Sequence, residues 1–220
     1  MNETRWDRLP AATRQRFGQR FAELTARGAD IDGEARLADA LAPRGATILD
    51  AGSGLGRVGA ALAARGHAVT AVEKDPVLAA ESRQTHPDLT VVEADLAELT
   101  PELLRAAGRP AEYDIIVVVG NVLILLAEGT ERATLNRLGA LLASEGRILA
   151  GFHLAAGAPG SRVYPFAEFE ADAVTAGLRV ELHASTFDLR PAGGDFAVVV
   201  LSHATDPATR PCAVVQRPVR

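Results

Sequence analysis

Three acidic residues and a glycine-rich loop are the parts of this sequence whose residue types and spacing best fit a ligand site. Each acid ends a short apolar run: Asp50 follows TIL, Glu73 follows AVTAV and Asp95 follows LTVVEA. Asp50 leads into AGSGLGR, with glycine at every second position. Such glycines let a ligand lie against the backbone, and the N–H groups of a following helix can bind a carboxylate. A carboxylate about 20 residues later can accept hydrogen bonds from a ribose diol.

The order of elements predicts where these residues lie. From Thr47 onward, short β-rich runs alternate with helical stretches, and the runs are TILDA, AVTAVE, LTVVEAD, YDIIVVVG and GRILAGFHL. This alternation predicts a parallel sheet with helices on both faces. The carboxyl ends of parallel strands share one edge, where open α/β sheets bind ligands. We therefore expect the three acids and the loop to line one crevice.

The last two β-rich runs, VELHASTFDL and DFAVVVLSHA, are separated only by RPAGG, which is too short for a crossover helix. They must pair as a hairpin, so one strand runs antiparallel. The predicted fold class is thus α/β, a three-layer Rossmann-like sandwich whose seven-stranded, mostly parallel sheet has a reversed last strand. Apolar spacing predicts two preceding helices, over Pro10–Arg27 and Gly33–Leu41.

Four motifs resemble those of the class I S-adenosylmethionine-dependent methyltransferases, from Thr47 to about His203. ILDAGSGLGRVG resembles the first motif of the family, AVEKDP the second, EADLAEL the third and YDIIVVVGNVL the fourth, and the closing hairpin is similar to its reversed last strand. The resemblance implies S-adenosylmethionine as cofactor, with S-adenosylhomocysteine as product. It implies a helical cap at 1–44, a methyltransferase domain at 45–206 and a tail at 207–220.

The resemblance also implies roles for individual residues. Three glycines of the loop back the methionine part of the cofactor, and Asp50 lies near its ammonium group. Glu73 holds the ribose hydroxyls, Asp95 the adenine, and the GNV turn walls the methyl group. The expected cofactor-binding residues are Asp50, Ala51, Gly52, Ser53, Gly54, Gly56, Glu73, Lys74, Asp95, Leu96, Gly120, Asn121 and Val122.

Two alternatives remain open at this point. The segment GLGRVG at residues 54–59 also satisfies GxGxxG, which indicates a nicotinamide-dependent oxidoreductase. Against it, Asp50 would repel a pyrophosphate but attract an ammonium and a sulfonium. The hairpin also departs from the sixth parallel strand of a dinucleotide fold. The second alternative is a non-catalytic member of the fold, which the intact loop and acids disfavour.

Methyl transfer is an in-line displacement that needs alignment but no obligatory catalytic residue. A hydroxyl or ammonium acceptor must lose a proton, and His153, at the end of GRILAGFHL, is the best placed base. A structural hydrogen-bonding role is the alternative for His153. Further candidates for contact with the substrate are Trp6, Arg36, Tyr164 and Asp195. We expect no metal, because the histidines lack metal-site spacing and Cys212 stands alone.

Charge and hydropathy restrict the partners. The net charge is −5, the wrong sign for holding nucleic acid through phosphates, and GNVL differs from the NPPY-type motif of base-methylating enzymes. We therefore expect a small-molecule acceptor methylated on oxygen or nitrogen.

No apolar run approaches the roughly 20 residues of a membrane span, and MNETRWDRLP does not resemble a signal peptide, so we expect a cytoplasmic protein. The N-terminal stretch is either a lid over the crevice or a cover for a sheet edge.

Overall fold

The computed structural model describes residues 3–155, 157 and 160–204. The expected tail at 207–220 and Cys212 lie outside the described residues. The expected boundary after residue 44 stays a prediction. The two predicted N-terminal helices are confirmed as α1 (Ala11–Ala26) and α2 (Gly33–Leu41).

The described part of the chain forms one seven-stranded sheet of order β3-β2-β1-β4-β5-β7-β6. The first five strands pair in parallel, and β7 runs antiparallel to both β5 and β6. The predicted mostly parallel sheet with a reversed last strand is therefore confirmed. The strands are β1 (Thr47–Ala51), β2 (Ala68–Glu73), β3 (Thr90–Glu93), β4 (Tyr113–Val118), β5 (Leu142–His153), β6 (Leu178–Ala184) and β7 (Phe196–His203).

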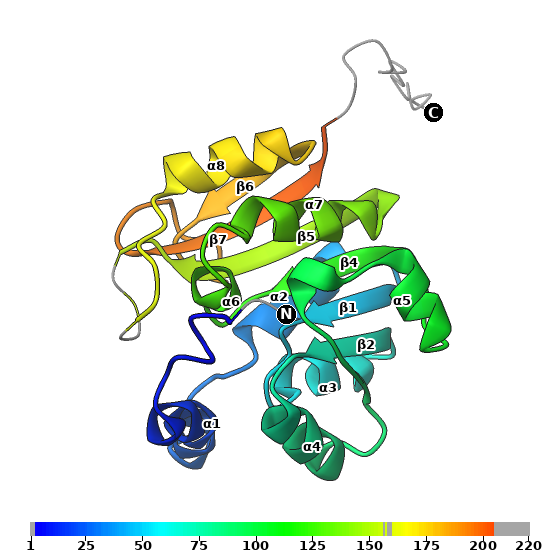
Figure 1. The fold of residues 1–220 in the computed structure, drawn as a ribbon, viewed down its shortest axis with the longest axis vertical. Coiled ribbons are helices and arrows are strands. Elements are labelled where there is room, and N and C mark those ends of the chain that lie inside the picture. The colour runs from blue at the N-terminus through cyan, green and yellow to red at the C-terminus, as the bar shows by residue number, and fades with distance from the viewer. Residues whose placement is uncertain (1–2, 156, 158–159, 205–220) are drawn as a thin grey trace, which may run out of the picture.

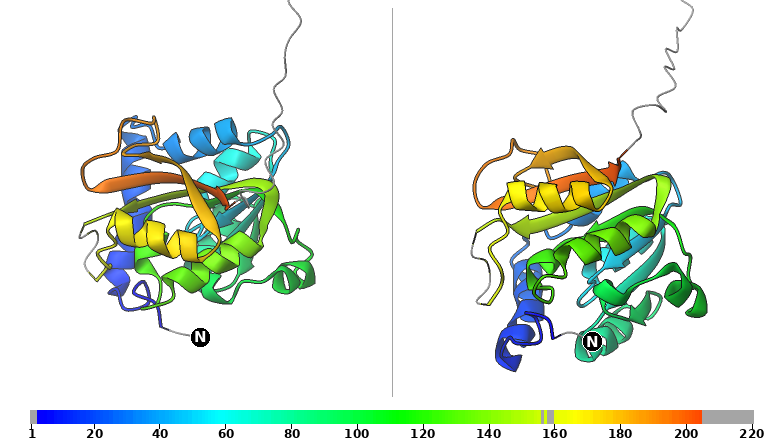
Figure 2. Two further views of the ribbon diagram at one scale, coloured as in Figure 1. Left: turned by 90° about the horizontal axis from the view of Figure 1, so that it is seen from above. Right: turned by 45° about the horizontal axis from the view of Figure 1, so that its top comes forward.

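Helices cover both faces of the sheet, as Figures 1 and 2 show. On one face α2, α3 and α4 pack, and on the other α5, α7 and α8 pack. From Ile115 to Val118 the central strand β4 is buried on both faces, which is why these four residues form a continuous apolar run. The remaining helices are α3 (Arg57–Ala63), α4 (Pro76–Thr85), the 3-10 turn η1 (Leu96–Glu98), α5 (Pro101–Ala106), α6 (Val122–Leu125), α7 (Glu131–Ala140) and α8 (Phe166–Thr175).

Two details differ from the simple alternation. Strand β5 starts at Leu142 rather than near Gly146, because Leu142 pairs with Tyr113 ahead of a register shift. Helix α1 lies at the end of the sheet rather than on either face (Figure 1), and Arg14 joins it to Asp75 at 3.2 Å. None of the described helices is both long and apolar enough to cross a membrane.

Candidate active site

The carboxyl ends of the parallel strands meet at the edge of the sheet where the strand order changes direction. From β1 the chain proceeds outward to β2 and β3, and then returns to β4 and β5 on the other side. Loops diverge at such a switch point and leave room for a ligand. The glycine loop follows β1, Glu73 ends β2, Gly120 follows β4 and His153 ends β5. The fold thus brings the predicted residues of both sides to one edge.

The glycine loop is anchored by the end of β2. The N–H groups of Gly52 and Ser53 donate to the carbonyl oxygen of Val72 at 2.8 and 3.0 Å. The N–H of Gly54 donates to Oε2 of Glu73 at 2.7 Å. Gly54 has a φ of +56°, which favours glycine, and a Cβ added there would meet no atom within 4 Å. The loop backbone at Gly54 is therefore open to a ligand.

The other two glycines of the loop are closely packed. A Cβ added to Gly52 would lie 2.6 Å from Cγ2 of Val122, in the turn after β4. This contact joins the two sides of the switch point. A Cβ added to Gly56 would meet Ser82 and Leu89, so the missing side chain of Gly56 serves the packing of the loop against α4.

Asp50 supports the loop from within the protein. Its side chain is almost fully buried, and its Oδ2 accepts a hydrogen bond from the N–H of Gly59 at 2.8 Å. Burial raises the pKa of Asp50 to about 7, although the bond from Gly59 opposes the shift. The structure thus directs the carboxylate toward α3, while its expected proximity to an ammonium group stays a prediction.

Glu73 presents a second buried carboxylate at the edge. Besides Gly54, it accepts a hydrogen bond from the N–H of Asp75 at 2.8 Å. Burial raises the pKa of Glu73, and the backbone hydrogen bonds oppose that rise. The next acid, Asp75, caps α4 by accepting the Val77 N–H at 2.9 Å. The end of β2 is therefore rigidly held, as precise positioning of a ligand requires.

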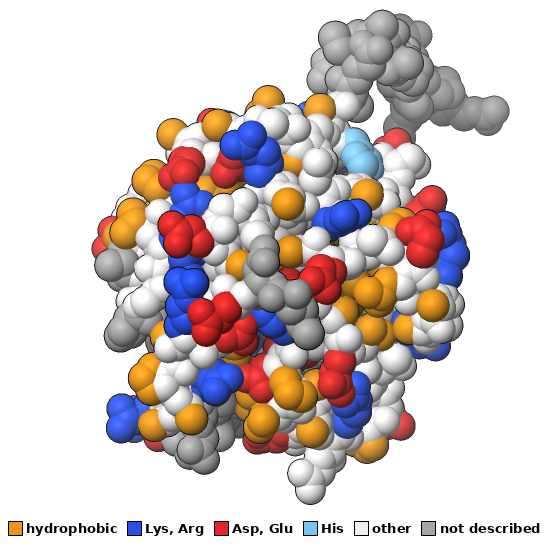
Figure 3. All heavy atoms as spheres, in the orientation of Figure 1, with side chains coloured by type: hydrophobic (Ala, Val, Ile, Leu, Met, Phe, Trp, Pro, Cys, Tyr) orange, Lys and Arg blue, Asp and Glu red, His pale blue; other side chains and the backbone are white. Residues whose placement is uncertain are grey.

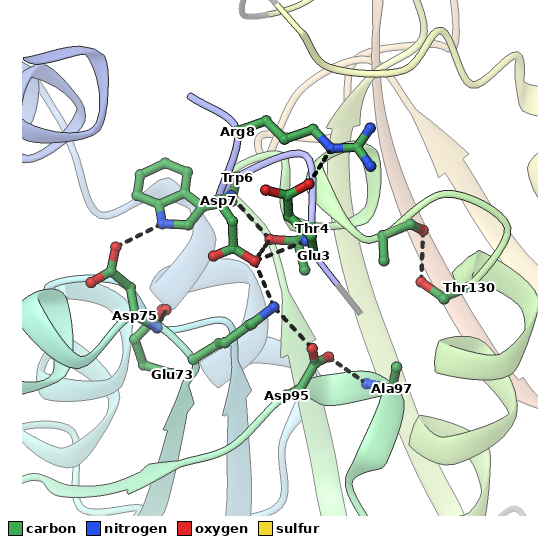
Figure 4. A network of polar contacts seen from close by, with 12 residues as sticks. Glu3, Thr4, Trp6, Asp7, Arg8, Glu73, Asp75, Asp95, Ala97 and Thr130 are labelled. Carbon is green, nitrogen blue, oxygen red and sulfur yellow. Dashed lines mark hydrogen bonds and ion pairs between the residues drawn. The ribbon is translucent and has the colours of Figure 1, made fainter. Parts of the chain in front are cut away.

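Residues 4–9 form an N-terminal strap that crosses this edge, as Figure 4 shows. The indole N–H of Trp6 donates to Oδ2 of Asp75 at 2.9 Å. The Lys74 ammonium lies between Asp7, at 2.7 Å, and Asp95, at 3.2 Å. Toward β4, the backbone N–H of Trp6 donates to the carbonyl oxygen of Leu125 in α6 at 3.1 Å. The strap thus spans from the β2 and β3 ends to α6.

A buried acid also ties the strap to the segment after β5. Glu131, at the start of α7, is only 3% exposed and accepts hydrogen bonds from two arginines. Its Oε1 lies 2.9 Å from Arg5 in the strap region and 3.0 Å from Arg162 beyond β5. A buried carboxylate needs such partners. One side chain therefore fastens both segments that flank the edge.

His153 and Asn121 lie together where β4 and β5 end. Oδ1 of Asn121 is 2.9 Å from the backbone nitrogen of His153 and 3.0 Å from its Nδ1. Asn121 has a φ of 73°, a left-handed conformation that asparagine tolerates better than most residues. The His153 ring also packs edge-on against Phe196, with centroids 5.0 Å apart.

The candidates for substrate contact are placed unequally. Tyr164 is a correction: it is fully buried beside Phe152, and its hydroxyl donates to Asp172 at 2.9 Å, so it belongs to the core. Arg36 pairs with Asp30 at 2.7 Å on an exposed surface. Asp195 is exposed beside the end of β5, and its carbonyl oxygen accepts the Leu154 N–H at 2.7 Å.

Three acids of this region, Asp7, Asp75 and Glu131, are not among the residues predicted from the sequence. Asp75 carried a local signal, because it directly follows Glu73 and Lys74 and precedes a proline that starts a helix. Asp7 and Glu131 carried none. Their partners lie 67 and 126 residues away in the chain, so only the folded structure pairs them.

The strap makes a testable prediction through Lys74, the only lysine of the sequence. Burial alone would lower its pKa, but hydrogen bonds to Asp7 and Asp95 outweigh burial and raise it. Asp7→Asn should therefore speed acetylation of Lys74 several-fold at neutral pH, as measured by peptide mass spectrometry. Glu3→Gln, in an exposed pair with Arg8, is the matched control. Equal rates in the two variants would show that Asp7 does not hold Lys74.

The residues present fit the expected cofactor. Gly54 and Gly120 both have positive φ, and a Cβ added to either would meet no atom within 4 Å. The Ser53 hydroxyl is buried and has no hydrogen-bond partner among the described residues. The carboxylate of Glu73, hydrogen-bonded to the Gly54 N–H, is suited to hydroxyl donors. Open backbone, an unsatisfied hydroxyl and a carboxylate together suit a small polar ligand.

Comparison with known proteins finds similarity over most of the chain. A family model described as a methyltransferase domain matches residues 48–146. A solved TehB-like SAM-dependent methyltransferase from Corynebacterium glutamicum is 36% identical, with a TM-score of 0.76. The match covers 88% of this chain and 100% of the Corynebacterium chain.

Two curated relatives match shorter stretches. Ribosomal RNA small subunit methyltransferase A of Anaeromyxobacter dehalogenans is 40% identical over 122 residues, 53% of this chain and 41% of that protein. Ribosomal RNA small subunit methyltransferase J of Alkalilimnicola ehrlichii is 39% identical over 101 residues, 39% of this chain and 37% of that protein. The matched stretches thus span about two fifths of the length of these curated relatives.

Proposed function

Because the chain belongs to the class I S-adenosylmethionine-dependent methyltransferases, we propose that it moves a methyl group from this cofactor to a small-molecule acceptor. The observation that carries the proposal is the bond between Glu73 and Gly54, which joins the acid at the end of β2 to the open glycine of the loop. In the proposed site Glu73 binds the ribose hydroxyls and Asp95 the adenine. Gly52, Ser53 and Gly54 lie along the methionine part.

The cofactor, when bound, supplies a methyl group whose leaving group is already activated by the positive charge on sulfur. The residues of this chain have to hold and align the two reactants. The anchored loop and the rigid end of β2 give that alignment on the cofactor side. On the acceptor side stand the Gly120–Val122 turn and the end of β5. The contacts of the strap with Lys74 and Asp75 support the role of the N-terminal stretch as a lid over the crevice.

Charge favours a small acceptor. The net charge of the chain is −5. On the face in Figure 3, arginine and lysine side chains alternate with aspartate and glutamate and form no continuous basic surface. A protein that holds RNA through phosphates needs such a surface. The names of the curated relatives make ribosomal RNA the alternative acceptor.

Calorimetry with S-adenosylhomocysteine, and in parallel with NADH and NADPH, tests the cofactor. We expect binding of S-adenosylhomocysteine alone; binding of a nicotinamide alone would overturn the proposal. Transfer of a radiolabelled methyl group to a panel of phenols, alcohols and amines, with ribosomal RNA in parallel, tests the acceptor. Labelling of RNA alone would reassign the acceptor class, and cofactor binding without any transfer would favour the non-catalytic alternative.

A further inference from the structure

We propose that Asn121 is a positioning residue that holds His153 in one tautomer, so that Nε2 of His153 takes a proton from the methyl acceptor. The inference rests on the proposed function and deepens it. It names the acceptor class as a hydroxyl or amine that loses a proton during transfer. Asn121 and His153 come from different strand ends, and their contact is therefore a product of the fold.

The tautomer follows from the identity of the hydrogen-bond donors. The backbone nitrogen of His153 always carries a hydrogen, so the Asn121 atom 2.9 Å away must be the amide oxygen and not the amide nitrogen. That same oxygen lies 3.0 Å from Nδ1 of His153. Oδ1 of Asn121 is an acceptor, and an unprotonated Nδ1 would be an acceptor as well, so the two atoms could not form a hydrogen bond. Nδ1 therefore carries the hydrogen. In the neutral ring Nε2 then holds the lone pair and is the basic atom.

The remaining contacts leave Nε2 available. It makes no hydrogen bond in the part of the chain that the structure describes, and the residue is half-buried rather than enclosed. The ring is held from the side by the edge-on contact with Phe196. The side chain therefore has a defined orientation and an unengaged base, which is what proton abstraction requires.

The turn that carries Asn121 also links His153 to the cofactor loop. Val122 packs against Gly52, so closely that a Cβ on Gly52 could not be accommodated. The backbone N–H of Asn121 donates to the carbonyl oxygen of Gly151 on β5 at 3.3 Å. One short turn thus contacts the loop after β1 and the end of β5. This places the base on the acceptor side of the switch point, opposite Glu73 and Asp95.

The lone pair of the acceptor oxygen or nitrogen forms a bond to the methyl carbon, while the carbon–sulfur bond breaks and its electron pair stays on sulfur. The acceptor proton moves to Nε2 of His153, and the resulting imidazolium later releases it to water. Asn121 stays a hydrogen-bond acceptor throughout, because Nδ1 is protonated in both forms of the ring. An acceptor that is already deprotonated, such as a carboxylate, does not need this step.

The first test needs no acceptor. In protein labelled with ¹⁵N-histidine, long-range ¹H–¹⁵N spectra of the free protein should show His153 as the Nδ1–H tautomer, assigned by its loss in His153→Gln. Asn121→Gly, which keeps the left-handed backbone, should release the tautomer, whereas Asn121→Asp should retain it because a carboxylate also accepts. An Nε2–H tautomer in the wild-type protein would overturn the proposal whatever the variants do.

The second test places Nε2 beside the methyl group. S-adenosylmethionine carries a positive charge on sulfur that S-adenosylhomocysteine lacks. The ¹⁵N resonances of the His153 ring should therefore differ between the two complexes, because the charge beside the ring is present in only one of them. Identical ring resonances in the two complexes would overturn the placement. Failure of either compound to bind would instead count against the proposed function, and the tautomer result would still stand.

The third test separates a positioning role from a structural one. On a phenol or amine acceptor found in the panel, His153→Gln and Asn121→Gly should lower kcat by about 10²- to 10⁴-fold with little change in KM, and remove the acidic limb of the pH profile. Asn121→Asp should restore much of the rate. His203→Gln, at the opposite edge of the sheet where it contacts Leu142, is the matched control. Equal kcat values in His153→Gln and the control would overturn the proposal.

Discussion

Replacing Glu73 with alanine is expected to weaken the binding of S-adenosylhomocysteine by about 10- to 100-fold for each hydrogen bond lost. A charge-assisted hydrogen bond contributes ~1.5–3 kcal/mol, and ~1.4 kcal/mol is a factor of ten. The same substitution removes the acceptor of the Gly54 N–H, so the loop loses an anchor as well. Calorimetry at neutral pH measures the change. The affinity of Glu73→Gln, which keeps one acceptor oxygen, should lie between those of the wild-type protein and Glu73→Ala.

The matched control is Glu93→Ala. Glu93 ends β3 as Glu73 ends β2, but it pairs with Arg83 on an exposed surface and does not contact the glycine loop. We expect wild-type affinity in that variant. Wild-type affinity in Glu73→Ala as well would mean that the end of β2 does not hold the ribose, and the proposed cofactor position would have to be abandoned.

Replacing Asp50 with asparagine is expected to stabilise the cofactor-free protein, with a gain that grows with pH. The pKa of Asp50 is about 7 in the folded protein and 3.8 in its ordinary state. Because the folded value is the higher one, the contribution of Asp50 to stability is fully present below pH 4 and is lost as the pH rises to 7. Asparagine keeps an oxygen for the Gly59 N–H but carries no buried charge.

The expected size of this gain follows from linkage. Each pH unit within the window changes the free energy of unfolding by ~1.4 kcal/mol, so from pH 5 to pH 7 the advantage of Asp50→Asn grows by about 2 kcal/mol and then levels off. At this chain length, that corresponds to about 4–8 °C in the melting temperature. Thermal unfolding followed by circular dichroism at pH 5, 6, 7 and 8 measures it.

Asp30→Asn is the control of opposite sign. A hydrogen bond from Arg36 lowers the pKa of exposed Asp30 to about 2, so its contribution is present above pH 4 and lost only below it. Between pH 5 and pH 8 that variant should therefore keep a constant difference from the wild-type protein. If the difference in stability between Asp50→Asn and the wild-type protein were also constant over this range, ionisation of Asp50 would not destabilise the folded protein, and the prediction would be wrong.

The meeting of the glycine loop and the strand-end acids at one edge of the sheet was predictable because it depends on the local order of the elements. Strand, acid and glycine loop follow each other within a few residues, and parallel strands bring their carboxyl ends to one edge whatever the loops do. Prediction failed where an isolated residue type was the only signal. Tyr164 was such a case: burial with Phe152 and Phe169 takes it into the core, and nothing in its immediate sequence distinguishes a packed tyrosine from a substrate contact.

The alternation of strands and helices, the reversed last strand and the family resemblance can all be read from the order of residues, because hydrophobic periodicity and short connections act over neighbouring residues. Which side chains meet across the edge is visible only in the folded protein. The strap reaches Lys74 and Asp75, Glu131 joins two distant arginines, and Asn121 meets His153 from another strand. These contacts join residues that lie far apart in the chain, so packing of the whole domain has to bring them together.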